Sequence, residues 1–587
     1  MQRPSAYNAR VVEGISSLFG QEAHADCRIV FCLEHAEKEV NKAQASTSGR
    51  KREREDDVDN STVGEPLPAH SFVLRFASDK LAAQLEWPTK TANGANEQER
   101  PAAKKAKGKG RKAAAKPCAA EEQQRPSPPV VEVWLGSEAE LPAARAALQF
   151  AYTGRVEAGD IREALQVRRQ AAYLQMEGCV EACAAAVREK LTAAGAEAVP
   201  AAGAAAASAT APAAAAAEAV LELYRCTDVW PDPADDAAFA ALLTEAKRRL
   251  VAHFGDALAV LNDQTLYDQM RALPAVGLEA LLESDDFGTD SESSVVLLLA
   301  EWMEAADNFS RTDAAARRRL CGLLRLAQCS KTYLAWVLPM LAARHARKPD
   351  DAAGWFAVSP VAVTCVSNFA AATEEETQAL TASGHLVLLL QPHADTWLST
   401  KRRRQCLPAA GRTFDFNISL TALEQHEQEQ KLASMAPGSA CLITSVVPGA
   451  PTSGRVVALG LDWSGVLQRK KGQDAAAGCF AIVNMPRVLL LPGLDEVLVM
   501  SAAVTAFPRM RLTVYRGSAA RGGQREKAWE GDPGGALSMG MGRGHERCLP
   551  LRPVSASAQQ SGGAVAARWA AYLYGGQIRC ALTLLPP

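Results

Sequence analysis

The chain has 587 residues, of which 48% are hydrophobic and 22% are charged, and its net charge is -2. This length exceeds what one hydrophobic core can hold, so we expect three or four domains. The small net charge excludes an overall attraction to nucleic acid or anionic membranes, and any such binding would have to be local.

The cysteines and the apolar runs indicate a soluble intracellular protein. The 14 cysteines form no CxxC pair, which argues against a zinc finger or ribbon and favours buried structural thiols in a reducing compartment. Residues 1–20 lack the apolar core of a signal peptide, and no run is long enough to span a membrane. We therefore predict no membrane association and a location in the nucleus, the cytoplasm or both.

Four segments have a polar, charged, Pro-rich or Ala-rich composition that does not build a core. Segments 34–66 and 88–129 contain runs such as GRKREREDD and KKAKGKGRK, and we predict them to be disordered inserts. We predict linkers at 193–219, which is Ala-rich and could be helical in part, and at 346–380. These segments delimit an N-terminal tail (1–23), a first domain (24–192), a second domain (220–345) and a third domain (381–587).

The first domain reads as a small α/β unit once its two inserts are set aside. DCRIVFCL (26–33) and VVEVWL (130–135) are typical of strands, and residues 66–87 predict a short extended entry and two helices. Leu141, Ala144, Leu148 and Tyr152 follow helical spacing up to Gly154, which would end that helix. Residues 160–191 predict two more helices.

The rest of the chain changes from helical to strand-like patterns. Residues 218–345 are predicted to be helical throughout, with Ser291 as a possible cap of one helix. From about residue 384 the runs are short and often alternate, beginning with HLVLLL (385–390) and ending with IRCALTLL (578–585). Many short strands with turn signals predict an antiparallel sandwich or barrel, and we expect a β-sandwich in a multidomain α+β fold.

Three pieces of the first domain resemble a BTB (POZ) domain. They are DCRIVF at 26–31, LPAHSFVLRFASDKLAAQL at 67–85 and LQFAYTGRVE at 148–157. The helical domain resembles a BACK domain through two groups of residues: Leu273, Pro274, Leu278, Leu281, Leu282, Asp285 and Asp286, then Ser291, Glu292, Val295, Trp302, Leu323, Leu324 and Arg325. The domain order is similar to that of plant light-response BTB proteins and their green-algal relatives, whose C-terminal part is a MATH-like (TRAF-like) sandwich.

The resemblance implies a non-enzymatic, substrate-specific adaptor of a cullin-3 ubiquitin ligase. In such proteins the BTB domain forms a homodimer and docks the cullin, while the C-terminal domain captures a protein substrate. It implies a dimer interface that includes His70, Phe72, Val73 and Leu74, and a cullin-binding surface that includes Leu141, Arg145, Phe150 and Tyr152. Phe150 and Tyr152 have an alternative reading as core residues.

Two further groups of residues are candidates for binding. Lys104, Lys105, Lys107, Lys109, Arg111 and Lys112 form a basic run without aromatic residues. This run predicts a nuclear import signal or a non-specific polyanion contact, or else a solvated insert, and gives no sign of specific nucleic-acid binding. Trp397 and Trp463 stand near turns and are substrate-binding candidates, although tryptophan is more often buried in the core.

The sequence contains no set of residues that indicates catalysis, a cofactor or a metal. GMGRG (540–544) lacks the lysine and hydroxyl residue of a phosphate-binding loop, and no GxSxG or HExxH motif occurs. The leading hypothesis is therefore the cullin-3 adaptor. The alternative is a dimeric scaffold or transcription-associated protein that does not bind cullin, because the 88–129 insert occupies the docking loop and lacks a clear hydrophobic-x-Glu triplet.

Overall fold

The structure is a computed structural model, and it describes most of the chain in two compact units. The units are Met1–Glu245 and Ala246–Pro587, and each is described by itself. The described residues are 9–34, 62–86, 128–196, 210–305, 307–432, 440–444, 450–451, 454–470, 475–490, 504–506, 509–518, 525–553 and 563–586.

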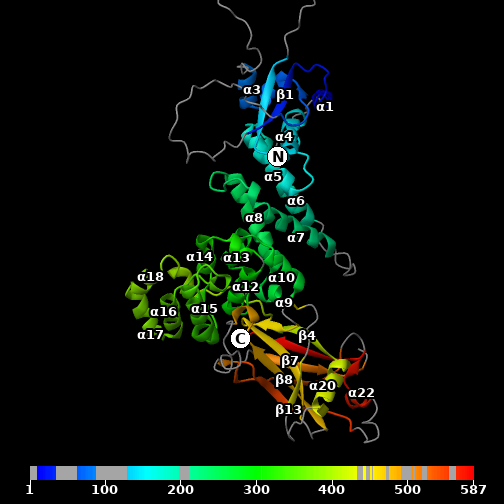
Figure 1. The fold of residues 1–587 in the computed structure, drawn as a ribbon, viewed down its shortest axis with the longest axis vertical. Coiled ribbons are helices and arrows are strands. Elements are labelled where there is room, and N and C mark those ends of the chain that lie inside the picture. Colours follow the sequence, from blue (N-terminus) through cyan, green and yellow to red (C-terminus); the bar gives the residue numbers. More distant parts are fainter. Residues whose placement is uncertain are drawn as a thin grey trace, which may run out of the picture. The chain divides into compact units, whose positions relative to one another are not determined.

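The first unit is built on a three-stranded mixed sheet in the order β2-β1-β3, of which strand β1 is labelled in Figure 1. Strand β1 (Cys27–Leu33) pairs antiparallel with β2 (Leu67–Ala69) and parallel with β3 (Val130–Leu135). Alternate residues Cys27, Ile29 and Phe31 of β1 are buried, because successive side chains of a strand point to opposite faces of the sheet. All three strands lie in segments where the sequence predicts extended structure.

Eight helices are described in or at the edge of the first unit, and several confirm the predicted elements. The predicted helix that ends at Gly154 is α4, and Gly154 has the left-handed conformation that glycine tolerates. The predicted N-terminal tail contains α1, and the predicted Ala-rich linker is helical at both ends, where α6 finishes and α7 begins. The helices are α1 (Ala9–Ser16), α2 (Ser71–Ala77), α3 (Asp79–Glu86), α4 (Leu141–Thr153), α5 (Ile161–Tyr173), α6 (Cys179–Ala196), α7 (Thr210–Arg225) and α8 (Ala237–Phe254).

The second unit begins with a helical part centred on α12 (Glu292–Glu304). Every residue of α12 from Glu292 to Met303 is buried, so neighbours cover the helix on all sides. Ser291 caps α12 by accepting a hydrogen bond from the Ser293 amide, as predicted. The other helices of this part are α9 (Ala257–Asn262), α10 (Gln264–Arg271), α11 (Ala275–Glu283), α13 (Asn308–Arg311), α14 (Ala314–Gly322), α15 (Leu338–Arg347), α16 (Pro360–Ala371), α17 (Glu374–Ala382), α18 (His385–Leu390) and α19 (Ala394–Trp397).

Two predictions for this part are wrong. The segment 346–380 is not a linker, because it contains α16 and most of α17, and residues 385–390 form helix α18 rather than a strand (Figure 1). Leu386 and Leu390 are buried four residues apart, whereas Leu388 and Leu389 are 67% and 61% exposed. This is helical periodicity, which a short apolar run does not reveal.

The C-terminal part consists of antiparallel sheets, in agreement with the strand-rich pattern. One five-stranded sheet has the order β11-β10-β15-β14 with β4 also paired to β15, and the other has the order β13-β8-β7-β5 with β6 also paired to β7. Gly465 of β7 faces Phe416 of β4, and a Cβ atom at Gly465 would overlap that ring, so the two sheets are in close contact there.

The described strands and α-helices of the C-terminal part are as follows: β4 (Arg412–Ser419), α20 (Leu420–Leu432), β5 (Ala440–Thr444), β6 (Val456–Ala458), β7 (Leu461–Lys470), β8 (Ala476–Asn484), β9 (Val504–Ala506), β10 (Met510–Tyr515), β11 (Lys527–Gly531), β12 (Ala536–Ser538), β13 (Gly542–Pro550), α22 (Ala564–Trp569), β14 (Leu573–Tyr574) and β15 (Gln577–Leu584). Strands β9 and β12 form a separate pair. Among the described helices, none is long and apolar enough to cross a membrane.

Candidate protein-interaction sites

Helix α2 of the first unit presents two phenylalanines to solvent. Phe72 and Phe76 are 49% and 85% exposed, whereas Val73 and Leu74 between them are buried. Residues four positions apart lie on the same side of a helix, so the two rings form one exposed aromatic face. Asp26 holds the start of the helix by accepting hydrogen bonds from the Ser71 amide and hydroxyl at 2.7 and 2.5 Å.

His70 fixes the N-terminal end of α2 from inside the core. Its backbone amide donates to the Tyr152 hydroxyl at 3.0 Å, and its ring nitrogens lie 3.3 Å from that hydroxyl and 2.9 Å from the Ala23 carbonyl oxygen. Burial raises the pKa of Tyr152 to about 12, so the hydroxyl stays protonated at neutral pH. The His70 ring also packs edge-on against Phe72, which links the exposed aromatic face to the core.

The four predicted dimer-interface residues therefore divide into core and surface. His70, Val73 and Leu74 are 1%, 7% and 0% exposed, so in the folded chain they cannot contact a second copy directly. Only Phe72 of the predicted set is exposed, and the prediction missed Phe76. The i, i+4 spacing of the two phenylalanines was the signal that could have identified Phe76.

The predicted cullin-binding residues all lie on α4, but only Arg145 is exposed. Leu141 and Phe150 are half-buried and pack against the core of the first unit. Tyr152 is 4% exposed, and its ring packs against Phe19 and His70. The core reading of Tyr152 is thus the one that matches the structure. The six basic residues of the predicted nuclear signal, 104–112, lie outside the described residues.

Both tryptophans that were substrate-binding candidates are buried. Trp397 is 6% exposed and donates its indole N–H to the Cys321 carbonyl at 3.0 Å, and it belongs to the helical part rather than to the sheets. Trp463 is completely buried in β7, and its indole N–H donates to the Ala458 carbonyl at 3.0 Å. These side chains stabilise the fold and are not accessible to a substrate.

The turn between β6 and β7 docks into the helical part of the same unit. The Asn262 side chain bonds to both backbone polar groups of Val457, donating at 2.9 Å and accepting at 2.8 Å. The Gly460 amide donates to Ser294 Oγ at 2.9 Å, and the Tyr333 hydroxyl donates to the Gly460 carbonyl at 2.6 Å. Side chains of three helical segments therefore recognise the backbone of this turn, which ties the sheets to the helices at a fixed place.

Asp290 completes this recognition. Its carboxylate accepts hydrogen bonds from the Leu459 amide at 2.6 Å, the Ser294 hydroxyl at 2.6 Å and the Ser291 amide at 2.9 Å. Removal from water raises the pKa of Asp290 above its usual range, against the lowering effect of these donors. Leu459 has a φ of 52°, so the hydrogen bond holds a left-handed residue in place.

A basic segment before β4 packs across the helices. Arg403 is buried and donates to Glu292 at 3.0 and 3.4 Å and to the Ser284 and Leu323 carbonyls. The Thr289 amide donates to the Arg404 carbonyl, and the Cys406 amide donates to the Thr289 carbonyl. We call residues 399–407 the strap. Nothing local in the sequence KRRR at 401–404 distinguishes a buried arginine from an exposed one, so the burial of Arg403 was not predictable.

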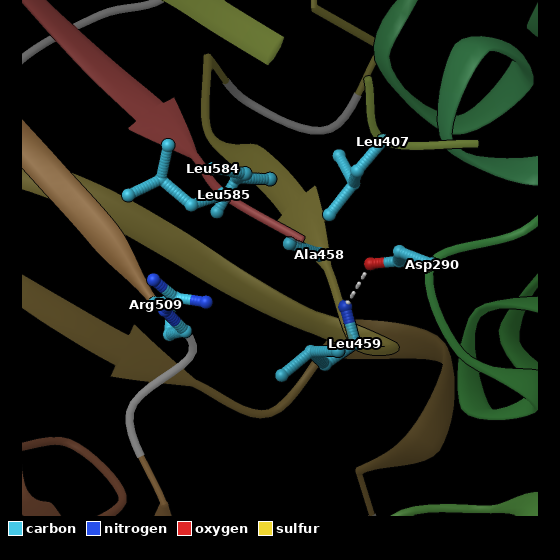
Figure 2. Close-up of a pocket in the computed structure, with 7 residues that line it drawn as sticks. All are labelled: Asp290, Leu407, Ala458, Leu459, Arg509, Leu584 and Leu585. Carbon is cyan, nitrogen blue, oxygen red and sulfur yellow. Dashed lines mark hydrogen bonds between the residues drawn. The ribbon is translucent and has the colours of Figure 1, made fainter. Parts of the chain in front are cut away.

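A small pocket opens where the strap, the β6–β7 turn and the end of β15 meet (Figure 2). Its volume is about 100 Å³. Ala458 and four leucines form its walls, Asp290 lies on the side of the helices, and Arg509 lies on the opposite side in Figure 2. The leucines are Leu407, Leu459, Leu584 and Leu585.

Within the described ranges, no group of three or more His, Cys, Asp or Glu side chains could hold a metal ion. Nine of the described cysteines are buried and three are half-buried, and all twelve are free thiols. Burial raises the pKa of Asp462, beside the β6–β7 turn, to about 7, and Arg455 at 3.6 Å partly opposes this effect.

No protein-family profile matches the chain, and no curated protein matches it significantly.

Proposed function

We propose that this chain is a dimeric BTB–BACK adaptor that holds a protein target on its second unit and presents it to a cullin-3 ubiquitin ligase. The proposal assigns the first unit to a BTB domain, the helical part of the second unit to a BACK domain, and the C-terminal sheets to a MATH-like β-sandwich. The carrying observation is the exposed aromatic face of α2, formed by Phe72 and Phe76.

The aromatic face supports self-association. Exposed large apolar side chains that lie together on one rigid element are typical of protein interfaces, and aromatic residues dominate the energy of such interfaces. The BTB-like motif at 67–85 includes this helix, and dimerisation is the role that the resemblance assigns to it. A symmetric dimer would bring the two α2 helices together through the same surface of each copy.

The second unit supports the role of a target-holding arm. The hydrogen bonds of Asn262, Asp290, Ser294 and Tyr333 to the β6–β7 turn hold the sheets at a defined place on the helices. A rigid connection fixes the orientation in which a bound target is presented. Arg145, the exposed member of the predicted cullin-binding set, is the residue on α4 that would contact the cullin.

The test of self-association is a pair of charge-introducing substitutions in the full-length chain. Phe72→Asp and Phe76→Asp should convert a dimer to a monomer in sedimentation velocity, because each buries an unpaired carboxylate if the interface forms. Met541→Asp is the control, because Met541 is 59% exposed and lies in the second unit. A monomeric wild-type chain at micromolar concentration would contradict the proposal.

Cullin binding is measured on the same proteins with purified cullin-3. We expect the wild-type chain to bind and Arg145→Glu to weaken binding, whereas Arg188→Glu, an exposed change on α6, should not. A chain that dimerises but does not bind cullin-3 would favour the alternative of a dimeric scaffold. The 88–129 insert lacks a clear hydrophobic-x-Glu triplet, and this observation favours that alternative.

A further inference from the structure

We propose that the pocket between the strap, the β6–β7 turn and β15 binds a target segment through one aliphatic side chain flanked by an acidic residue (Figure 2). The aliphatic side chain enters the leucine-lined pocket, and the acidic group pairs with Arg509 at its edge. This inference rests on the proposed adaptor function and specifies the class of target that the second unit recognises.

The walls of the pocket are held in place by hydrogen bonds. The Leu459 amide is bound by Asp290 at 2.6 Å, and the Leu585 amide donates to the Arg509 carbonyl at 2.7 Å. Leu407 comes directly after Cys406, whose amide donates a backbone hydrogen bond to the Thr289 carbonyl. Gly411 fits closely against β15, because a Cβ atom there would lie 2.6 Å from the Leu584 carbonyl oxygen. A pocket with fixed walls loses little entropy on binding, which favours affinity.

The size of the pocket determines what it can hold. Sites for cofactors and drug-sized ligands enclose roughly 300–1,000 Å³, so a pocket of about 100 Å³ is too small for them. A leucine-lined cavity of roughly 150 Å³ accommodates one benzene molecule, so this pocket suits a group of the size of an aliphatic side chain. A single apolar side chain in a well-packed pocket is the usual anchor of a protein interface.

The polar groups favour an acidic neighbour for that anchor. Asp290 is already bound by two amides and a hydroxyl, so it offers little to a ligand. Arg509 is exposed, and its guanidinium donates to the Pro586 carbonyl at 3.3 Å. In the part of the chain that the structure describes, no carboxylate forms an ion pair with Arg509. Its charge is therefore available to a target carboxylate beside the pocket.

The probe is a phage library of random twelve-residue peptides, selected on the full-length wild-type chain. We expect enrichment of peptides with Leu, Ile, Val or Met next to Asp or Glu. Binding of an enriched peptide is then measured by fluorescence polarisation. Leu585→Trp, which fills the pocket, should weaken the binding of the peptide at least twentyfold, and Arg509→Glu should weaken this binding about fivefold or more. Arg487→Glu, an exposed change outside the pocket, should leave it unchanged.

Two outcomes would overturn the inference: no aliphatic–acidic motif is enriched, or the peptide binds both pocket variants as tightly as it binds wild type. Arg509→Glu guards against a folding defect, because it changes an exposed side chain. The outcome is distinguishable from failure of the adaptor function. A chain that dimerises and binds cullin-3 without enriching the motif refutes the pocket alone, whereas a peptide-binding monomer refutes the adaptor alone.

Discussion

Replacing Arg403 with methionine should strongly destabilise the second unit. The side chains of Arg403 and Glu292 are 0% and 2% exposed, so their ion pair is buried. The substitution removes both hydrogen bonds from Arg403 to Glu292. The Glu292 carboxylate then keeps the hydrogen bond that it accepts from the Arg325 amide at 2.9 Å. Removing one partner of a buried ion pair costs about 3–5 kcal/mol, because the remaining charge stays desolvated.

Hydrogen exchange of the full-length chain measures this cost. Helix α12 is buried from Glu292 to Met303, so the slowest exchange of its amides reports the opening of the surrounding fold. A loss of about 3 kcal/mol corresponds to exchange faster by roughly a hundredfold or more. The matched control is Arg402→Met, a change at the adjacent exposed arginine, for which we expect an effect within about 0.5 kcal/mol.

A double substitution separates the charge from the packing. With methionine at both 403 and 292, no unpaired charge remains, and replacing both members of a buried pair by apolar residues is often close to neutral. We expect the double variant to recover at least half of the stability that Arg403→Met loses. If Arg403→Met and Arg402→Met change α12 exchange equally, the buried ion pair does not stabilise this unit and the reasoning is wrong.

Two further predictions concern the β6–β7 turn. Gly460→Ala should destabilise the second unit by about 3 kcal/mol or more in thermal unfolding, because its Cβ would lie 2.5 Å from the Tyr333 hydroxyl. The control is Gly384→Ala: Gly384 is also left-handed but has open space around it, so we expect a cost of only about 1–2 kcal/mol. Burial raises the pKa of Asp462 from 3.8 to about 7, so between these values the native chain binds a proton that the unfolded chain has released, and its stability falls as pH rises. Denaturation from pH 5 to 7 should show a negative slope of up to about 1.4 kcal/mol per pH unit that Asp462→Asn removes, and equal slopes in both proteins would contradict the assigned burial.

Local patterns predicted the elements of the first unit well. The short apolar run at 26–33, the alternation at 130–135 and the glycine at 154 each have a local physical cause, so strands β1 and β3 and helix α4 were predictable. Residues 385–390 were not, because the five apolar residues after His385 fit a strand and a buried helix equally well. Only the packing of Leu386 and Leu390 against neighbouring elements decides between them.

The candidate sites were less predictable, because burial depends on partners that are distant in the chain. Trp463 is near a turn in the sequence, but it is completely buried in a strand whose sheet is covered on both faces. Arg403 is buried against Glu292, which lies 111 positions away in the chain. The pocket combines the strap, a turn and the end of the last strand, and no local pattern relates these three segments.

The docking of the β6–β7 turn determines how this chain can be divided. Ending the chain at residue 411 would remove the β6–β7 turn, whose backbone groups are recognised by Asn262, Asp290, Ser294 and Tyr333. These side chains would then lack their hydrogen bonds to the turn. Buried polar groups that lose their hydrogen-bond partners lower the stability of the fold. A deletion of the C-terminal sheets would therefore damage the helices as well, and the phenotype of such a truncation could not be assigned to lost target binding alone.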